Sequence, residues 1–183
     1  MLHIDFTPFP VLKTERLTLR QPAVSDAPEI FTLRSDQEIN KYLDRKPANS
    51  IDDARDFIQR VNENSHKNES IYWAITFSDK NILVGTICLF CFSDEAGKCE
   101  IGYELLTEFQ GQGIMKEALE KVIDYAFNTI NVQQIEAFFH KDNQASKKLL
   151  EKLSFENATE PDKPDADILY YRLEHAAKRS QRL

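Results

Sequence analysis

The chain has 183 residues and a formal net charge of -7, with 42% hydrophobic and 29% charged residues. This length suits one domain, and the composition is too apolar for an intrinsically disordered chain. The acidic balance argues against direct binding to nucleic acid or to an anionic membrane, both of which require basic patches, and is compatible with a cationic acceptor such as an amine.

The sequence shows no export signal, no membrane-spanning segment and no pattern of paired cysteines. The first ten residues lack the basic region and apolar stretch of an export signal. The longest apolar run, residues 82–92, is too short to cross a bilayer as a helix. The three cysteines are irregularly spaced, so no disulfide framework is expected and a metal site is not indicated. We therefore expect a cytoplasmic protein that uses no metal.

The N-terminal half predicts a strand, two helices and three further strands. Residues 16–21 alternate polar and apolar side chains, which is typical of a strand. Ser25 and Asp26 offer caps for a helix that reaches Leu33, and Ser50 offers the cap of a second helix. Strands at 72–77, 82–92 and 98–106 are separated by short polar turns, which predicts an antiparallel meander.

The C-terminal half predicts a strong helix from 113 to about 129, a strand at 134–140, a helix at 143–153 and a last strand at 168–173. Residues 156–167 read as an exposed acidic loop. The order predicts an α/β (α+β) fold, with a mixed, mostly antiparallel sheet of six to seven strands flanked by about four helices. Residues 1–175 are expected to form a single domain, and 176–183 a polar tail.

Two of the five glycines, Gly111 and Gly113, lie between a predicted strand and the best predicted helix. Glycines there let the backbone turn sharply and bring bare N–H groups close to a ligand. A helix N-terminus adds unsatisfied donors and a partial positive charge, which suits a phosphate or pyrophosphate. A plain loop with a glycine cap is the alternative, because short glycine patterns are common.

The segments Glu100-Ile-Gly-Tyr-Glu-Leu-Leu and Phe109-Gln-Gly-Gln-Gly-Ile-Met-Lys-Glu-Ala resemble the acetyl-CoA-binding core of the GNAT superfamily of N-acetyltransferases. The opening Leu12-Lys-Thr-Glu-Arg-Leu-Thr-Leu-Arg looks like the start of the Rim-type ribosomal-protein N-terminal (alanine/serine) acetyltransferases. The resemblance implies a GNAT-like fold that uses acetyl-CoA as cosubstrate. It also implies a set of cofactor-binding residues: Leu105, Leu106, Gln110, Gly111, Gln112, Gly113, Ile114, Met115 and Asn143.

Two positions depart from the family pattern in the cofactor region. Glu108 stands where the phosphate loop usually opens with Arg or Gln, and Ser154 replaces a glycine. The tyrosine that many members use to protonate the leaving thiol is absent, since Leu150 stands at the corresponding position. Lys147 is placed where it could reach a phosphate of the cofactor.

Amide formation from a thioester needs a group that takes a proton from the amine and a group that gives one to the sulfur. Glu100 and Glu104 share one face of their strand. The resemblance implies Glu100 as the general base, with Glu104 as the second candidate and Ser146 as the acid. The alternatives are a Glu100 paired with a cation, a Glu104 solvated at the strand end and a Ser146 on the helix surface. His140 is a weaker candidate base.

The sequence therefore predicts an acetyl-CoA-dependent N-acetyltransferase that acts on a primary amine by direct transfer in a ternary complex. The leading acceptor is a protein N-terminal α-amine, such as that of a ribosomal protein. An acetyltransferase for a small amine (a polyamine or an amino sugar) and a non-catalytic CoA-binding sensor are the alternatives. A homodimer is compatible with the resemblance, and no membrane partner is expected.

Overall fold

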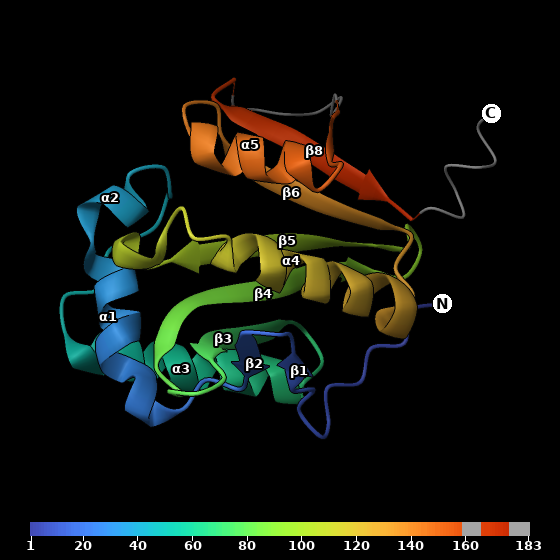
Figure 1. The fold of residues 1–183 in the computed structure, drawn as a ribbon. Helices are drawn as coiled ribbons and strands as arrows, with labels where there is room; N and C mark the ends of the chain where they lie inside the picture. The colour runs from blue at the N-terminus through green and yellow to red at the C-terminus, as the bar shows by residue number, and fades with distance from the viewer. Residues whose placement is uncertain (159–165, 176–183) are drawn as a thin grey trace.

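The computed structural model describes residues 1–158 and 166–175. The expected tail at 176–183 and much of the expected acidic loop lie outside this described part. Figure 1 shows the arrangement of the helices and strands. The strands are β1 (Leu12–Lys13), β2 (Leu17–Arg20), β3 (Ile71–Phe77), β4 (Leu83–Ser93), β5 (Lys98–Leu105), β6 (Gln134–His140), β7 (Glu156–Asn157) and β8 (Ile168–Glu174). The α-helices are α1 (Ala27–Ser35), α2 (Gln37–Asn40), α3 (Ile51–His66), α4 (Ile114–Tyr125) and α5 (Gln144–Lys152).

The eight strands form one mixed sheet in the order β1-β2-β3-β4-β5-β6-β8-β7. Every neighbouring pair is antiparallel except β5 and β6, which run parallel. The predicted fold class is confirmed. The described sheet has eight strands because two two-residue strands, β1 and β7, add to those expected from sequence, and α2 is a further short helix.

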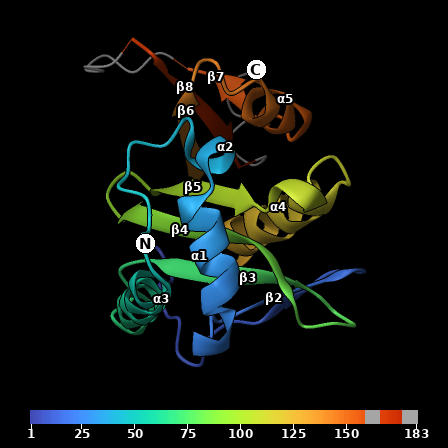
Figure 2. The same cartoon turned by 90° about the vertical axis from the view of Figure 1, so that its left-hand side faces the viewer.

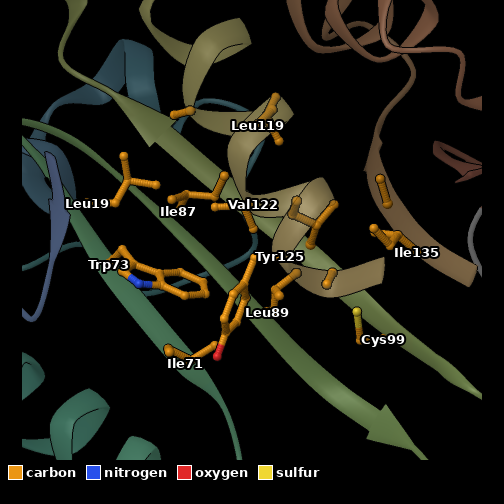
Figure 3. Packing of buried hydrophobic residues seen from close by; sticks show 14 of the residues in the cluster. Leu19, Ile71, Trp73, Ile87, Leu89, Cys99, Leu119, Val122, Tyr125 and Ile135 are labelled. Carbon is orange, nitrogen blue, oxygen red and sulfur yellow. The ribbon is translucent and has the colours of Figure 1, made fainter. Parts of the chain in front are cut away.

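Helices cover the sheet on both faces. In Figure 2, α3 lies on one side of the strands and α4 on the other, while α1 crosses in front of the strand ends. Under α4, Trp73 packs edge-on against Tyr125 with ring centroids 5.7 Å apart, and both lie among buried aliphatic side chains (Figure 3). A second buried cluster joins α1 and α3, with Ile30, Leu33 and Ile58 at its centre. The apolar faces of these helices are therefore buried against the sheet and against each other.

Of the two predicted N-terminal helix caps, the one at α3 forms and the one at α1 does not. The Ser50 side chain accepts from the Asp53 amide, and Asp53 accepts back from Ser50, as a capping box requires. Asp26 precedes α1 without a side-chain cap, because its carboxylate instead binds the Arg20 guanidinium through two contacts of 2.7 Å. The α4 helix ends at Tyr125 and continues as a π-helical turn over Ala126–Ile130.

The parallel pair β5–β6 is hydrogen-bonded at one end only. Its register joins Lys98 to Gln134, Cys99 to Ile135 and Glu100 to Glu136. Beyond Glu100 the pairing stops, although β5 continues to Leu105 and β6 to His140. The two strands therefore diverge, and none of the described strands pairs with the remaining edge of β5 on that side.

Gly85 keeps β4 close to this diverging strand, and we expect its replacement by alanine to destabilise the fold. An added Cβ would lie 2.5 Å from the Glu104 carbonyl oxygen and 2.8 Å from a methyl of Leu105. Backbone would have to move, at a cost of roughly 1–3 kcal/mol in the free energy of unfolding. Urea unfolding measures this, with Gly102→Ala as the milder control, since its Cβ would lie 3.2 Å from Cys88. Equal losses for the two variants would contradict the prediction.

Candidate active site

A cavity of about 880 Å³ opens where β5 and β6 diverge. Its walls come from the free half of β5, the end of β6, the first turn of α4, the length of α5, and the segment that contains α2. Of the residues predicted to bind a cofactor or to act in catalysis, it brings together Glu104, Leu105, Gln110, Gly111, Gly113, Ile114, Met115, Asn143 and Ser146. Glu100, Leu106 and Gln112 are not among the described residues that line it.

The glycine loop has the geometry that its sequence predicts. Gly111 and Gly113 adopt φ values of 74° and 76°, in the left-handed region that favours glycine. Gly113 precedes α4, and its carbonyl accepts the first helical hydrogen bond, from the Glu117 amide. The amides of Ile114 and Met115 come before that bond, so they have no partner within the helix. The loop therefore offers bare N–H donors and the positive end of α4 to the cavity.

Glu117 ties the start of α4 to the N-terminal hairpin. Its carboxylate accepts from the Thr14 hydroxyl at 2.5 Å, from the Arg16 amide at 3.0 Å and from the Arg16 side chain at 2.7 Å. Burial alone would raise the pKa of Glu117, but the hydrogen bonds from Thr14 and Arg16 hold that pKa below its usual value. Arg16 also donates to the Gln112 carbonyl. The strands at one sheet edge thus fix the glycine loop, and Gln112 belongs to this support.

The hydrogen bonds of β5 decide which of its residues face the cavity. The Leu106 amide donates to Val84 of β4, and its carbonyl accepts from Phe109, so both main-chain groups of Leu106 are used within the protein. Because main-chain groups alternate along a strand, those of Leu105 and Tyr103 point away from β4 toward the open edge. The Leu106 side chain is buried against α1 and α3 instead. The Leu105 carbonyl accepts from the Gln110 side chain at 3.2 Å, so the edge offers a ligand the Leu105 amide and the main-chain groups of Tyr103.

Ser146 lies in the first turn of α5 and is almost fully buried. Its amide donates to the Asn143 side-chain oxygen at 3.0 Å, so Asn143 caps the helix while it lines the cavity. Its hydroxyl lies 2.6 Å from the Tyr103 hydroxyl of β5. The helix-surface alternative for Ser146 is therefore wrong: the side chain points to the sheet and the cavity.

The two candidate carboxylates have different surroundings. The Glu104 carboxylate accepts hydrogen bonds from the two terminal guanidinium nitrogens of Arg45, at 2.6 Å and 2.5 Å. Glu104 is therefore not solvated at the strand end, which was the alternative interpretation. Glu100 lies four residues earlier on the same face, at the last residue pair before β5 and β6 diverge. It stands opposite Glu136, whose buried carboxylate accepts from Lys98 and Tyr170.

His140 forms part of the cavity wall together with Tyr42. The two rings stack with centroids 5.4 Å apart, which links the loop after α2 to the end of β6. The His140 Nδ1 atom accepts from the Asp142 amide at 3.2 Å. The same Nδ1 atom lies 3.6 Å from the Asp142 carboxylate, so both of these contacts tie the ring to the turn after β6. This arrangement favours a structural role for His140 over that of a base.

Charges in the cavity wall are separated by sign. The α4 and α5 side carries three lysines, Lys116, Lys148 and Lys152, and none of its described lining residues is acidic. The opposite wall carries Glu38, Asp44 and Glu104 beside one lysine, Lys41. Lys147, predicted to reach a phosphate of the cofactor, is not among the described lining residues, whereas its neighbour Lys148 and Lys152, one turn later, line the cavity. One wall suits phosphate groups and the other a cation.

The Arg45–Glu104 pair, Tyr42 and the Tyr103 hydroxyl were not anticipated from sequence as parts of the site. Arg45 and Glu104 are 59 residues apart, and no local pattern connects them. Within residues 1–158 and 166–175, no group of three or more side chains that could hold a metal ion is found, and no helix is long and apolar enough to cross a membrane. Cys88, Cys91 and Cys99 are free thiols.

Comparison with known proteins agrees with this geometry. The family model of the acetyltransferase (GNAT) domain matches residues 16–156. An uncharacterized N-acetyltransferase, p20 of Bacillus licheniformis, is 37% identical over 145 residues, which cover 79% of this chain and 82% of that protein. A GNAT-family acetyltransferase structure from Bacillus anthracis superposes with a TM-score of 0.76 at 22% identity, covering 90% of this chain and 98% of that one.

A structure of the ribosomal L7/L12 α-N-protein acetyltransferase RimL in complex with coenzyme A gives a TM-score of 0.78 at 20% identity, over 90% of this chain and 98% of that one. These two structures support the fold, while the family match and the p20 sequence establish the relationship. The chain belongs to the GNAT acetyltransferase family and is an N-acetyltransferase.

Proposed function

We propose that this N-acetyltransferase moves the acetyl group of acetyl-CoA to the α-amine of a protein N-terminus, by direct transfer in a ternary complex. The cavity carries the proposal, because it joins a bare helix N-terminus and glycine loop to an open strand edge and to an acidic wall. GNAT acetyltransferases use acetyl-CoA, and the related RimL structure contains coenzyme A.

The residues present fit acetyl-CoA along the length of the cavity. Amides at the start of α4, from Gly111 to Met115, would hold the pyrophosphate, since the left-handed glycines turn this loop toward the cavity; the Gln110 amide, also predicted for this role, donates to the Thr107 carbonyl instead. The edge groups of Leu105 and Tyr103 would pair with the amides of the pantetheine arm. Lys148 and Lys152 supply positive charge for further phosphate. The thioester supplies an activated acetyl group with a thiol leaving group.

The protein's own part in the chemistry is to place an amine and to move protons. Glu100 is the proposed base, since it lies on the same strand face as Glu104 at the last residue pair before β5 and β6 diverge. Because it is not among the described residues that line the cavity, it would take the proton through a water. Ser146, in the first turn of α5, is the proposed acid at the leaving sulfur and recovers its proton from water at product release. Asn143 keeps that turn capped.

An α-amine is a better acceptor than a lysine side chain in this setting. Its reference pKa lies near 8, so roughly a tenth is neutral at pH 7, whereas a lysine is almost fully charged. Lys41 lies 4.0 Å from the Glu38 carboxylate on this wall, so Asp44 is the carboxylate there that would attract an ammonium group, opposite the lysines. The name of the RimL neighbour, an α-N-protein acetyltransferase, supports the same class of acceptor.

Intact-mass measurement of acetyl transfer tests the proposal. The purified protein and acetyl-CoA are offered peptides with free N-termini, peptides whose only amine is a lysine side chain, polyamines and aminoglycosides. Acetylation of the N-terminal peptides alone is the expected result. Transfer to a small amine instead would replace the acceptor class, and no transfer despite a raised melting temperature with acetyl-CoA would favour a binding protein.

The Arg45–Glu104 pair is expected to affect acceptor binding more than chemistry. Arg45 also binds the side chain of Asn40 and the carbonyl of Leu33, so the pair anchors the α2 segment that lines the cavity. Glu104→Gln should raise the acceptor KM by about tenfold and lower the free energy of unfolding by about 1–3 kcal/mol, because it weakens a largely buried ion pair.

Steady-state kinetics with acceptor and acetyl-CoA varied separately check this expectation. Arg45→Met is the matched variant from the other side of the pair and should give the same acceptor defect. The double variant should be no worse than either single one. A fall in kcat of about 100-fold with an unchanged acceptor KM would instead identify Glu104 as the base.

A further inference from the structure

The hydroxyl pair of Tyr103 and Ser146 connects the sheet to the first turn of α5 inside the cavity. We propose that Tyr103 is a positioning residue, which donates to Ser146 and so directs the Ser146 proton toward the leaving sulfur. The inference rests on the proposed function, in which Ser146 is the acid. It adds a residue from the strand face opposite the one that carries Glu100 and Glu104.

A serine hydroxyl on its own is a poorly aimed donor. It carries one proton, rotates freely and can point that proton at any acceptor within reach. The Ser146 amide is already committed to Asn143, and among the described residues the Tyr103 oxygen is the hydrogen-bond partner of its hydroxyl. The direction of this one contact, 2.6 Å long, therefore decides where the Ser146 proton points.

Physical chemistry favours the direction from tyrosine to serine. A phenol is a stronger acid than an aliphatic alcohol, and an alcohol oxygen is the better acceptor, so the stronger bond has Tyr103 as donor. Burial raises the pKa of Tyr103 to about 12, so its proton is present throughout the neutral range. A hydroxyl that accepts one hydrogen bond becomes a stronger donor in the next. Ser146 then has its own proton free for an acceptor in the cavity.

The location of Ser146 makes that proton useful at a sulfur that gains negative charge. It is the third residue of the nine-residue helix α5, within the first turn, where the helix field favours an anion. In the transfer step the amine nitrogen bonds to the carbonyl carbon, the carbon–sulfur bond breaks and the sulfur takes the electron pair. The Ser146 proton passes to the sulfur, and Tyr103 keeps its own proton while it orients the serine.

Three variants test whether Tyr103 acts through Ser146: Ser146→Ala, Tyr103→Phe and the double variant. Ser146→Ala should lower kcat by about 100-fold, as expected for loss of an acid. Tyr103→Phe removes one oxygen and should lower kcat by about tenfold, with the KM for acetyl-CoA within about threefold of the original. The double variant should match Ser146→Ala, because Tyr103 acts only through the serine.

A second readout does not depend on turnover. The thiol of bound coenzyme A is titrated by thiolate absorbance, and the same titration with dethio-coenzyme A, which lacks the sulfur, removes the contribution of protein groups. The pKa of the bound thiol should be lower than that of the free thiol, and both Tyr103→Phe and Ser146→Ala should raise it. A role confined to packing would leave this pKa unchanged.

Tyr171→Phe is the matched control for tethering of α5. The Tyr171 hydroxyl also joins a strand to that helix, through Glu151 at 3.1 Å, but Tyr171 is not among the residues that line the cavity. It should leave both kcat and the thiol pKa unchanged. An equal loss in Tyr171→Phe would assign the effect to helix anchoring and overturn the inference.

Other outcomes separate the inference from the proposed function. An unchanged Tyr103→Phe enzyme, losses that multiply in the double variant, or a larger loss for Tyr103→Phe than for Ser146→Ala would each overturn the positioning role. They would leave an active acetyltransferase in place. Absence of acetyl transfer by the unsubstituted protein would overturn the proposed function itself.

Discussion

Replacing Glu100 with glutamine is expected to lower kcat for acetyl transfer by about 100-fold or more, because the amide cannot take a proton from the amine. Affinity for acetyl-CoA should stay the same, since Glu100 is not among the residues that line the cofactor cavity. The loss should shrink as pH rises from 7 to 9, where roughly nine tenths of an α-amine with a pKa near 8 is already neutral.

Initial rates across this pH range, together with calorimetric titration of coenzyme A, check the prediction. Glu104→Gln is the matched control, since it lies on the same strand face and is expected to change the acceptor KM instead. A Glu100→Gln enzyme with normal kcat at pH 7 would exclude Glu100 as the base. A loss that stays constant with pH would indicate an effect on amine placement rather than on proton removal.

Replacing Gly111 with alanine is expected to weaken the binding of coenzyme A by at least about tenfold. An added Cβ meets no protein atom within 4 Å, so the variant should fold. A residue with a Cβ at a φ of 74° costs roughly 1–2 kcal/mol, which favours a turn of the local backbone that would re-aim its amides. The methyl group would also occupy cavity space where the loop meets the ligand.

Isothermal titration with coenzyme A and a thermal unfolding curve separate lost affinity from lost stability. Gly97→Ala is the control, because Gly97 has a similar φ of 63° but lies in the turn between β4 and β5, outside the lining of the cavity. It should lower stability without changing affinity. Unchanged coenzyme A affinity in Gly111→Ala would contradict the assignment of the glycine loop to the pyrophosphate.

The parts of the fold that local chemistry determines could be predicted from the sequence. The Ser50 capping box, the amphipathic stripe of α3 and the paired glycines before α4 each depend on residues a few positions apart. The two-residue strands β1 and β7 could not be predicted, because only their pairing with β2 and β8 defines them. The four-residue helix α2 is likewise too short to produce a periodic pattern.

The site was predictable where one segment forms it and not where distant segments meet. The glycine loop lies within a single stretch, whereas Tyr103 and Ser146 are 43 residues apart and Arg45 and Glu104 are 59 apart. The difference between Leu105 and Leu106 depends on strand register instead. The pattern identifies the end of β5, but only the register with β4 shows that the main-chain groups of Leu105 face the open edge and those of Leu106 do not.

The divergence of β5 and β6 also has a mechanical consequence. The strands on either side of it are joined across this parallel interface by three residue pairs, of which Glu100–Glu136 is the last. Beyond that point, the main-chain groups of β5 are left for a partner that carries amides of its own. A ligand that pairs there acts as a missing strand, so cofactor binding would stiffen the seam between the two parts of the sheet. The free enzyme and the cofactor-bound enzyme would then differ in the rigidity of the sheet, and not only in whether the cavity is occupied.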